Sequence, residues 1–183
     1  MRRSTFVLAA FAVGIFATGA TGQERPDFSG AWTVSAQPTV PGAGSGGSSG
    51  SLGSGWGDSF TLVQNAGTLT IERTYYRRAD LQPTLKSRYS LDGSETRNTV
   101  LMGRGPQVQV STTAWQDDKL VITTMYTESD VGDGQAVTCE VTQTLSLQPP
   151  PLAAWPASLV VETTRCGALG GPASTTRSVY TRN

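Results

Sequence analysis

The chain has 183 residues, 14 of them basic and 14 acidic, and no histidine. Without histidine, Ser-His-Asp catalysis, Cys-His catalysis and histidine-ligated metal sites are excluded, and two cysteines alone cannot hold a structural zinc ion. No other catalytic constellation stands out, so we predict a protein that is not an enzyme and uses neither a cofactor nor a metal. The balanced charge does not suit a nucleic-acid binder.

The N-terminal segment is typical of a secretory signal. Arg2 and Arg3 precede a 12-residue apolar stretch, Phe6–Ala17, and small residues lead to a predicted cleavage after Gly22. This stretch is shorter than the roughly 20 residues that cross a bilayer, and no later segment reaches that length, so we expect no transmembrane segment. We favour ordinary secretion, because the residues after Arg2-Arg3 fit a twin-arginine signal only loosely.

Cleavage would leave residues 23–183 as a single domain with a net charge of −2, because the signal holds two of the 14 basic residues and none of the 14 acidic ones. A chain of that length can bury a sizeable hydrophobic core. We expect this domain in the periplasm or outside the cell.

Ten later segments alternate between apolar and polar residues and are rich in Thr, Val and Tyr, which predicts β-strands. In chain order they are residues 29–35, 59–64, 68–74, 84–91, 95–101, 107–114, 119–127, 136–147, 158–165 and 176–182. Turn residues such as Asn65-Ala66-Gly67 and Asp92-Gly93-Ser94 separate neighbouring segments, which predicts antiparallel hairpins. We predict an all-β antiparallel meander of eight to ten strands, closed into an up-and-down barrel, with a β-sandwich as the alternative.

Residues 42–57 do not belong to the sheet. They are rich in Gly and Ser and lack the apolar surface needed to order a segment, so we predict a flexible loop between the first two strands. This loop is either a tolerated insertion or a lid, in which Leu52 and Trp56 dock over an opening of the barrel.

For two groups of charged residues we favour the simplest explanation, which is exposure to solvent. Glu128, Asp130 and Asp133 form a solvated hairpin tip rather than a Ca²⁺ site, because their spacing does not match an EF-hand loop. Seven basic residues lie between Arg73 and Arg104, against three acidic ones. They form a solvated sheet face, and the alternative is a surface for an anionic ligand or for the cell envelope.

The two cysteines, Cys139 and Cys166, predict one structural disulfide in an exported chain. A symmetric hairpin around the Pro-rich loop 148–157 pairs Leu147 with Ser158 and brings the two cysteines opposite each other, close enough to bond. The alternative is a pair of buried free thiols.

The same register places Gln143 opposite Glu162 on the face that carries the cysteines. A carboxylate on that more apolar face needs a polar partner or water. Glu162 is therefore either a polar anchor inside a cavity or a residue that a one-residue shift of the register turns outward, and these alternatives stay open.

The segment that follows the predicted signal carries a family resemblance. It reads Asp27-Phe28-Ser29-Gly30-Ala31-Trp32, a G-x-W motif at the start of the first strand. The motif resembles that of the lipocalins and the wider calycins, and the opening is similar to that of secreted bacterial proteins of lipocalin-like type. The resemblance implies that Trp32 closes the narrow end of a barrel and that a basic residue of the last strand, Arg182 or else Arg177, packs across it. This chain departs from lipocalins in lacking a Thr-Asp-Tyr-like motif and a C-terminal helix.

From the fold and the resemblance we predict binding of a small apolar or amphipathic molecule without catalysis, by burial of ligand surface in the barrel mouth. Taken singly, each candidate lining residue fits core packing better than ligand contact. The candidates are Leu85, Tyr89, Val108, Val110, Ile122, Val141, Gln143, Leu145 and Glu162.

Two other functions compete with ligand binding. An interaction module, such as an envelope scaffold or a barrel-type protease inhibitor, would act through its loops, with Trp155 of the Pro-rich loop as the natural contact. A carboxylate-based hydrolase would need a close pair of inward-facing carboxylates. The sequence identifies neither a specific ligand nor a protein partner.

Overall fold

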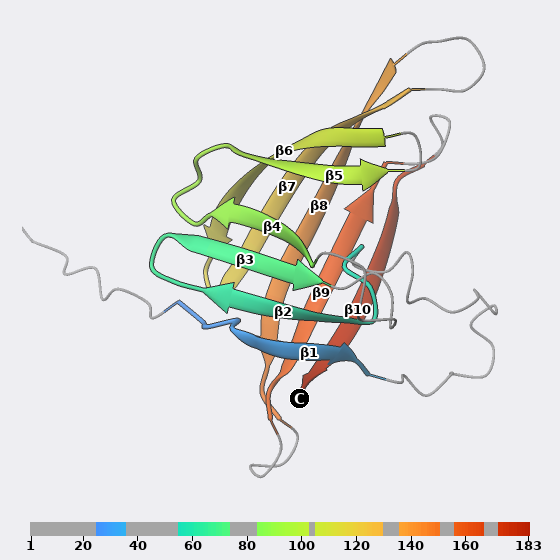
Figure 1. Cartoon of the computed structure of the whole chain (residues 1–183). Helices are drawn as coiled ribbons and strands as arrows, with labels where there is room; N and C mark the ends of the chain where they lie inside the picture. The colour runs from blue at the N-terminus through green and yellow to red at the C-terminus, as the bar shows by residue number, and fades with distance from the viewer. Residues whose placement is uncertain are drawn as a thin grey trace, which may run out of the picture.

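The computed structural model describes residues 25–35, 55–73, 84–102, 105–129, 136–150, 156–166 and 172–183. In these ranges all regular elements are β-strands (Figure 1). In chain order they are β1 (Gly30–Val34), β2 (Ser59–Gln64), β3 (Thr68–Arg73), β4 (Leu85–Ser90), β5 (Thr96–Met102), β6 (Gly105–Gln116), β7 (Lys119–Ser129), β8 (Ala136–Gln148), β9 (Ser158–Arg165) and β10 (Ser174–Arg182). The predicted signal 1–22, residue Leu52, the acidic residues Asp130 and Asp133, and Trp155 lie outside the described residues.

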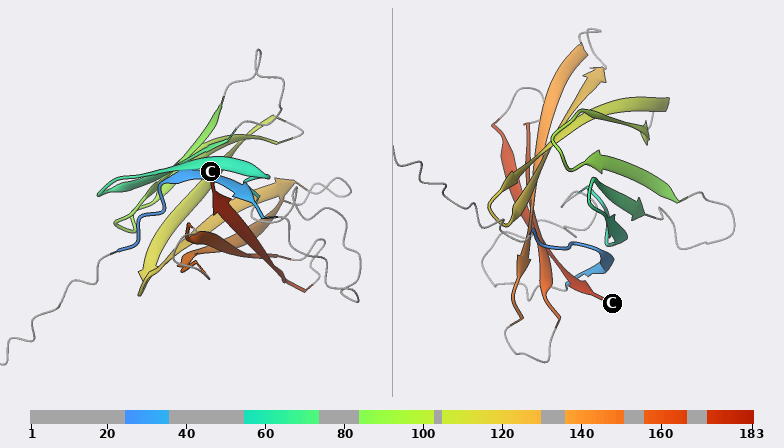
Figure 2. Two further views of the ribbon diagram at one scale, coloured as in Figure 1. Left: turned by 90° about the horizontal axis from the view of Figure 1, so that it is seen from below. Right: turned by 90° about the vertical axis from the view of Figure 1, so that its left-hand side faces the viewer.

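The ten strands form one antiparallel sheet in the order β4-β3-β2-β1-β10-β9-β8-β7-β6-β5. Neighbours in the sheet are neighbours in the chain, except that β1 pairs with β10 and so joins the first strand to the last. Figures 1 and 2 show the sheet curling round, so that β1–β5 cross one side of the molecule and β7–β10 the other. The result is a nearly closed up-and-down barrel, which confirms the predicted fold class over a sandwich.

The barrel closes between β4 and β5, the two ends of the strand order. Here the side chain of Asn98 on β5 pairs with the backbone of Arg88 on β4. The hydroxyl of Thr113 on β6 donates a hydrogen bond to the carbonyl oxygen of Ser90 on β4. Side chains therefore satisfy backbone groups at a place where an ordinary barrel would have a strand ladder.

The apolar core occupies one part of the barrel interior. Alternation along each strand turns every second residue inward, and the inward apolar residues pack together. The core comprises Phe28, Trp32, Trp56, Phe60, Leu62, Leu69, Ile71, Tyr89, Leu91, Leu120, Ile122, Leu145, Leu159, Val161 and Tyr180.

Trp32 belongs to this core. Its ring is fully buried, and its indole N–H donates a hydrogen bond of 3.0 Å to the carbonyl oxygen of Phe28. The guanidinium carbon of Arg182 lies 4.9 Å from the centre of the Trp32 ring, and the two residues are register partners across β1 and β10. Gly30 leaves room for the Arg182 side chain, because a Cβ at Gly30 would stand 3.0 Å from the Arg182 Nε. The alternative residue, Arg177, pairs instead with Glu162, at 4.0 Å.

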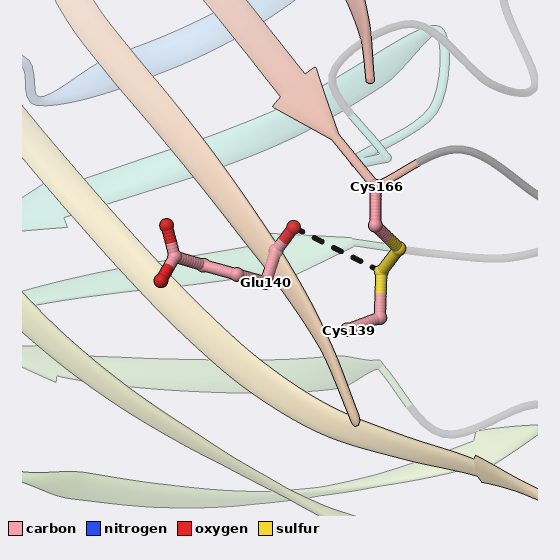
Figure 3. Close-up of a disulfide and its surroundings, with 3 residues drawn as sticks. All are labelled: Cys139, Glu140 and Cys166. Atoms are coloured by element: carbon pink, nitrogen blue, oxygen red, sulfur yellow. Dashed lines mark hydrogen bonds between the residues drawn. A yellow bond between two sulfur atoms is a disulfide. The ribbon is translucent and has the colours of Figure 1, made fainter. Parts of the chain in front are cut away.

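The disulfide between Cys139 and Cys166 is present, with the two Cα atoms 5.8 Å apart (Figure 3). The predicted register of β8 and β9 is nevertheless wrong by one residue, because Leu147 pairs with Leu159 and not with Ser158. Cys166 therefore lies opposite Glu140, and its N–H donates a 3.3 Å hydrogen bond to the Glu140 carbonyl oxygen. The disulfide therefore joins two residues that are offset by one position, rather than residues that lie directly opposite each other on the two strands.

The same shift decides between the two alternatives for Glu162. Gln143 pairs with Thr163, whereas Glu162 pairs with Thr144. Alternation then turns Glu162 to the outer face, where its side chain is 54% exposed beside Arg177. Glu162 is thus a surface residue and not a polar anchor inside the barrel.

Candidate functional site

The predicted lining residues divide between the two faces of the sheet. Six share the inward-facing parity of their strands, namely Leu85, Tyr89, Ile122, Val141, Gln143 and Leu145. Val108 and Val110 do not, because Ser111 and Thr113 are the buried residues of β6 and the even-numbered positions face outward. Val108 is 55% exposed, so its assignment to the lining is wrong, as is that of Val110. Val108 and Val110 lie outside because polar residues, Ser111 and Thr113, occupy the neighbouring inward positions of β6.

The inward-facing side chains change from apolar to polar along the barrel. On β9 they run from Leu159 and Val161 to Thr163 and Arg165, and on β3 the inward row ends at Arg73. Other strands also place buried polar side chains inside the barrel. We call the seven buried polar residues the polar layer: Ser87, Asn98, Ser111, Thr113, Thr124, Gln143 and Thr163.

Hydrogen bonds satisfy part of the polar layer. The hydroxyl groups of Ser111 and Thr124 are 2.9 Å apart, and Asn98 is held by the backbone of Arg88. Thr163 is fully buried, yet its hydroxyl oxygen has no hydrogen-bond partner among the described residues. Burial of an unpaired hydroxyl costs about 1–3 kcal/mol, so such a group calls for a further partner.

Tyr89 brings a phenol hydroxyl into the barrel interior. Burial raises the pKa of the Tyr89 hydroxyl above its usual value, while the positive charge of Arg73 and a hydrogen bond with Ser87 act in the opposite direction. The phenol is therefore neutral at physiological pH and keeps its proton for donation.

Two arginines reach the same glycine at the polar end. The Nη1 atom of Arg73 donates a hydrogen bond to the carbonyl oxygen of Gly55. The Nη2 atom of Arg165 lies 2.9 Å from the position that a Cβ at Gly55 would occupy, so that a larger residue there would displace the end of the Arg165 side chain. Gly55 also has a φ of +81°, which favours glycine. We call Arg73 and Arg165 the arginine pair.

The segment that holds Gly55 is anchored in the core. Trp56 is buried and packs edge-on against Phe60, with ring centres 5.3 Å apart. The hydroxyl of Tyr180 donates a 3.3 Å hydrogen bond to the carbonyl oxygen of Gly57. Trp56 thus fixes the backbone that the arginine pair approaches.

Sequence reasoning missed the arginine pair as an internal feature. It counted Arg73 in a basic group on a solvated face and assigned no role to Arg165. The available signal was parity, since Arg73 continues the inward row Leu69 and Ile71, and Arg165 continues Val161 and Thr163. Charged residues are rarely buried in proteins, so parity alone does not predict that an arginine points into the barrel.

The described residues offer no group of three or more His, Cys, Asp or Glu side chains that could hold a metal ion. No helix in the described ranges has the length and hydropathy that a membrane span requires. Comparisons with protein-family models, curated proteins and solved structures gave no match. The nearly closed ten-stranded barrel is compatible with a calycin-like barrel.

Proposed function

We propose that this protein is an exported, non-enzymatic, lipocalin-like barrel that binds a small apolar or amphipathic molecule in its interior. The observation that carries the proposal is the fully buried Thr163 hydroxyl, which lacks a hydrogen-bond partner in the described part of the chain and lies within a layer of other buried polar groups. A barrel that served only as a scaffold would gain stability from apolar residues at these positions. A few polar groups beside an apolar wall are characteristic of small-molecule sites.

Two further observations support this proposal. The contact of the Arg182 guanidinium with the Trp32 ring is of the kind that the resemblance to lipocalins implies. The disulfide between Cys139 and Cys166 is of a kind that persists in oxidising compartments, in agreement with the predicted export signal.

Native mass spectrometry of the protein exported by a bacterial host tests the proposal, followed by solvent extraction of the purified sample. A small molecule that is extracted in a stoichiometric amount would support a carrier function, and its mass would identify the class of ligand. An apo mass with no extractable compound, together with no binding of added amphiphiles, would contradict ligand binding.

One observation favours the interaction module as a second candidate. Val108 and Met125 are exposed on the outer face of β6 and β7, where Met125 pairs with Val110. Apolar side chains grouped on a surface are a common feature of protein contacts. Retention of a partner by the wild type, and its loss in Val108→Ser, would support that function.

A further inference from the structure

We propose that the outer face of β5–β8 binds a second copy of this chain, so that two barrels pack wall to wall around a two-fold axis parallel to these strands. The inference goes beyond ligand binding and does not depend on it. It names a partner for the exposed apolar side chains of β6 and β7 that favour an interaction module.

The contact centres on a row of side chains that crosses four neighbouring strands. Arg97 on β5 pairs with Val110 on β6. Val110 pairs in turn with Met125 on β7, and Met125 pairs with Glu140 on β8. All four side chains face outward, because a residue next to each of them on its strand is buried in the interior. We call these four residues the central row.

The central row is apolar in the middle and carries opposite charges at its two ends. Met125 is exposed, and Val108 lies two residues before Val110 on the same face of β6. In the described part of the chain three large apolar side chains are exposed, and two of them, Val108 and Met125, lie here. Apolar side chains that gather on a surface indicate a contact with another molecule.

The order of the central row makes it complementary to itself. A two-fold axis along the strands reverses the order of the strands in the second copy. Arg97 then lies opposite Glu140 of the second copy, and Val110 lies opposite Met125 of the second copy. Both contacts occur twice, as in every two-fold interface. An unrelated partner would have to reproduce this order, whereas a second copy already has it, so the charges favour self-association.

The row next to the central row carries no charge that would oppose this contact. Thr112 on β6 pairs with Thr123 on β7, and Thr123 pairs with Thr142 on β8, all on the outer face. Arg97 already contacts Glu95, with its Nη2 atom 2.9 Å from the carboxylate. An exposed ion pair contributes little, and a guanidinium has five N–H donors, so Arg97 has donors left for a second carboxylate.

The lengths of the side chains suit two curved walls. Figures 1 and 2 show that β5–β8 follow the curve of the barrel, so their outer face is convex. Two convex walls approach closely in the middle of a contact and separate toward its margins. The short Val110 lies in the middle, whereas the long side chains of Arg97 and Glu140 lie at the margins, where a wider gap has to be bridged.

Sedimentation velocity of the full exported protein over a range of concentrations measures the dimer. Glu140→Arg places Arg97 opposite a second cation, and Arg97→Glu places Glu140 opposite a second anion. Each variant alone should raise the dissociation constant of the dimer about tenfold or more, because like charges across an interface repel. Glu162→Arg is the matched control and should dimerise like wild type, since Glu162 is exposed on β9, outside the central row.

Mixing the two variants tests the two-fold axis itself. In the mixed pair, Arg97 of one copy again faces Glu140 of the other, and the two substituted positions also carry opposite charges. An equimolar mixture should therefore form a heterodimer with nearly wild-type affinity. If a thermal melt shows that either variant is unfolded, Met125→Asp takes its place and should weaken the wild-type dimer about tenfold or more.

Three results would overturn self-association through this face. They are a wild-type protein that stays monomeric up to about 1 mM, a dimer whose affinity is unchanged in the folded variants, and a mixture of the two variants that stays monomeric. None of these results bears on ligand binding, which the extraction experiment decides separately.

Discussion

The side chain of Asn98 on β5 forms a two-point contact with the backbone of Arg88 on β4. The Asn98 Oδ1 accepts a hydrogen bond from the Arg88 N–H at 2.8 Å, and the Asn98 Nδ2 donates one to the Arg88 carbonyl oxygen at 2.9 Å. A side-chain amide carries the same donor and acceptor pair as a peptide group, so Asn98 acts as one rung of a strand ladder. It links β4 and β5, the two strands between which the barrel is only nearly closed.

Replacing Asn98 should therefore destabilise the whole fold. Asn98→Ala removes both bonds and leaves two partly buried backbone groups unpaired, for an expected loss of about 2–3 kcal/mol in the free energy of unfolding. Asn98→Asp keeps the acceptor but sets a buried carboxylate oxygen against the Arg88 carbonyl oxygen, so its loss should be at least as large as that of Asn98→Ala. Denaturant melts of the three proteins measure these values, and a midpoint unchanged in Asn98→Ala would disprove the role of Asn98 in closure.

The burial of Trp32 and its contact with Arg182 give a second prediction. Trp32→Ala should lower the free energy of unfolding by about 3–5 kcal/mol, because it empties a fully buried site. Arg182→Gln should cost less, about 0.5–2 kcal/mol, since it removes only the cation over the indole face. Arg177→Gln on the same strand is the control, with an exposed ion pair worth at most about 1 kcal/mol. A loss of stability in Arg177→Gln as large as that in Trp32→Ala would contradict this order.

The disulfide should contribute measurably to stability. Cys139 and Cys166 are 27 residues apart in the chain, and a cross-link of that span destabilises the unfolded state by about 3.5 kcal/mol through lost chain entropy. Reductant should therefore lower the melting temperature of wild-type protein. The double variant Cys139→Ser and Cys166→Ser should melt lower and show no response to reductant, and a shift in that variant would mean that reductant acts elsewhere.

Acid should weaken the turn between β4 and β5. The Asp92 carboxylate accepts hydrogen bonds from the Ser90 hydroxyl at 2.6 Å and the Ser94 N–H at 2.8 Å. These bonds to Ser90 and Ser94 lower the pKa of Asp92 to about 2. Because the folded pKa lies below the unfolded one, the ionised Asp92 stabilises the fold above about pH 4, and this contribution disappears as pH falls through about 2.

Asp92→Asn isolates that charge, since its amide oxygen can still accept both bonds. We expect the wild type to melt above Asp92→Asn at neutral pH, with the difference shrinking between about pH 4 and pH 2. Thermal melts across that range measure it. A difference that stays constant down to pH 2 would show that the carboxylate charge does not contribute.

The ten strands were predictable because their alternation is strong and their turns contain Gly, Asp or Asn. The register of β8 and β9 was not, because loop conformation sets it, and the pairing of Gln148 with Ser158 leaves an odd number of residues in the Pro-rich loop where a symmetric hairpin assumed an even number. A shift of one residue was enough to move Glu162 from the inside to the outside.

The predicted ligand-lining face failed for a different reason. An apolar residue was assumed to face inward, yet β6 carries Val108 outside and Ser111 inside. Hydrophobic patterning identifies the buried face only when the interior is apolar. Likewise, Arg73 and Arg165 could be placed inside only by counting parity from their buried neighbours.

The pairing of β1 with β10 has a consequence for how this chain acquires its structure. The strand that must lie beside β1 is the last of the ten to be synthesised, and the Asn183 N–H reaches the carbonyl oxygen of Ala31 at 2.9 Å. Contacts between such distant parts of a sequence slow folding. Until β10 arrives, β1 and β9 each present an unpaired edge that could recruit other chains. A nascent polypeptide with this topology therefore cannot complete the sheet until β10 has been synthesised.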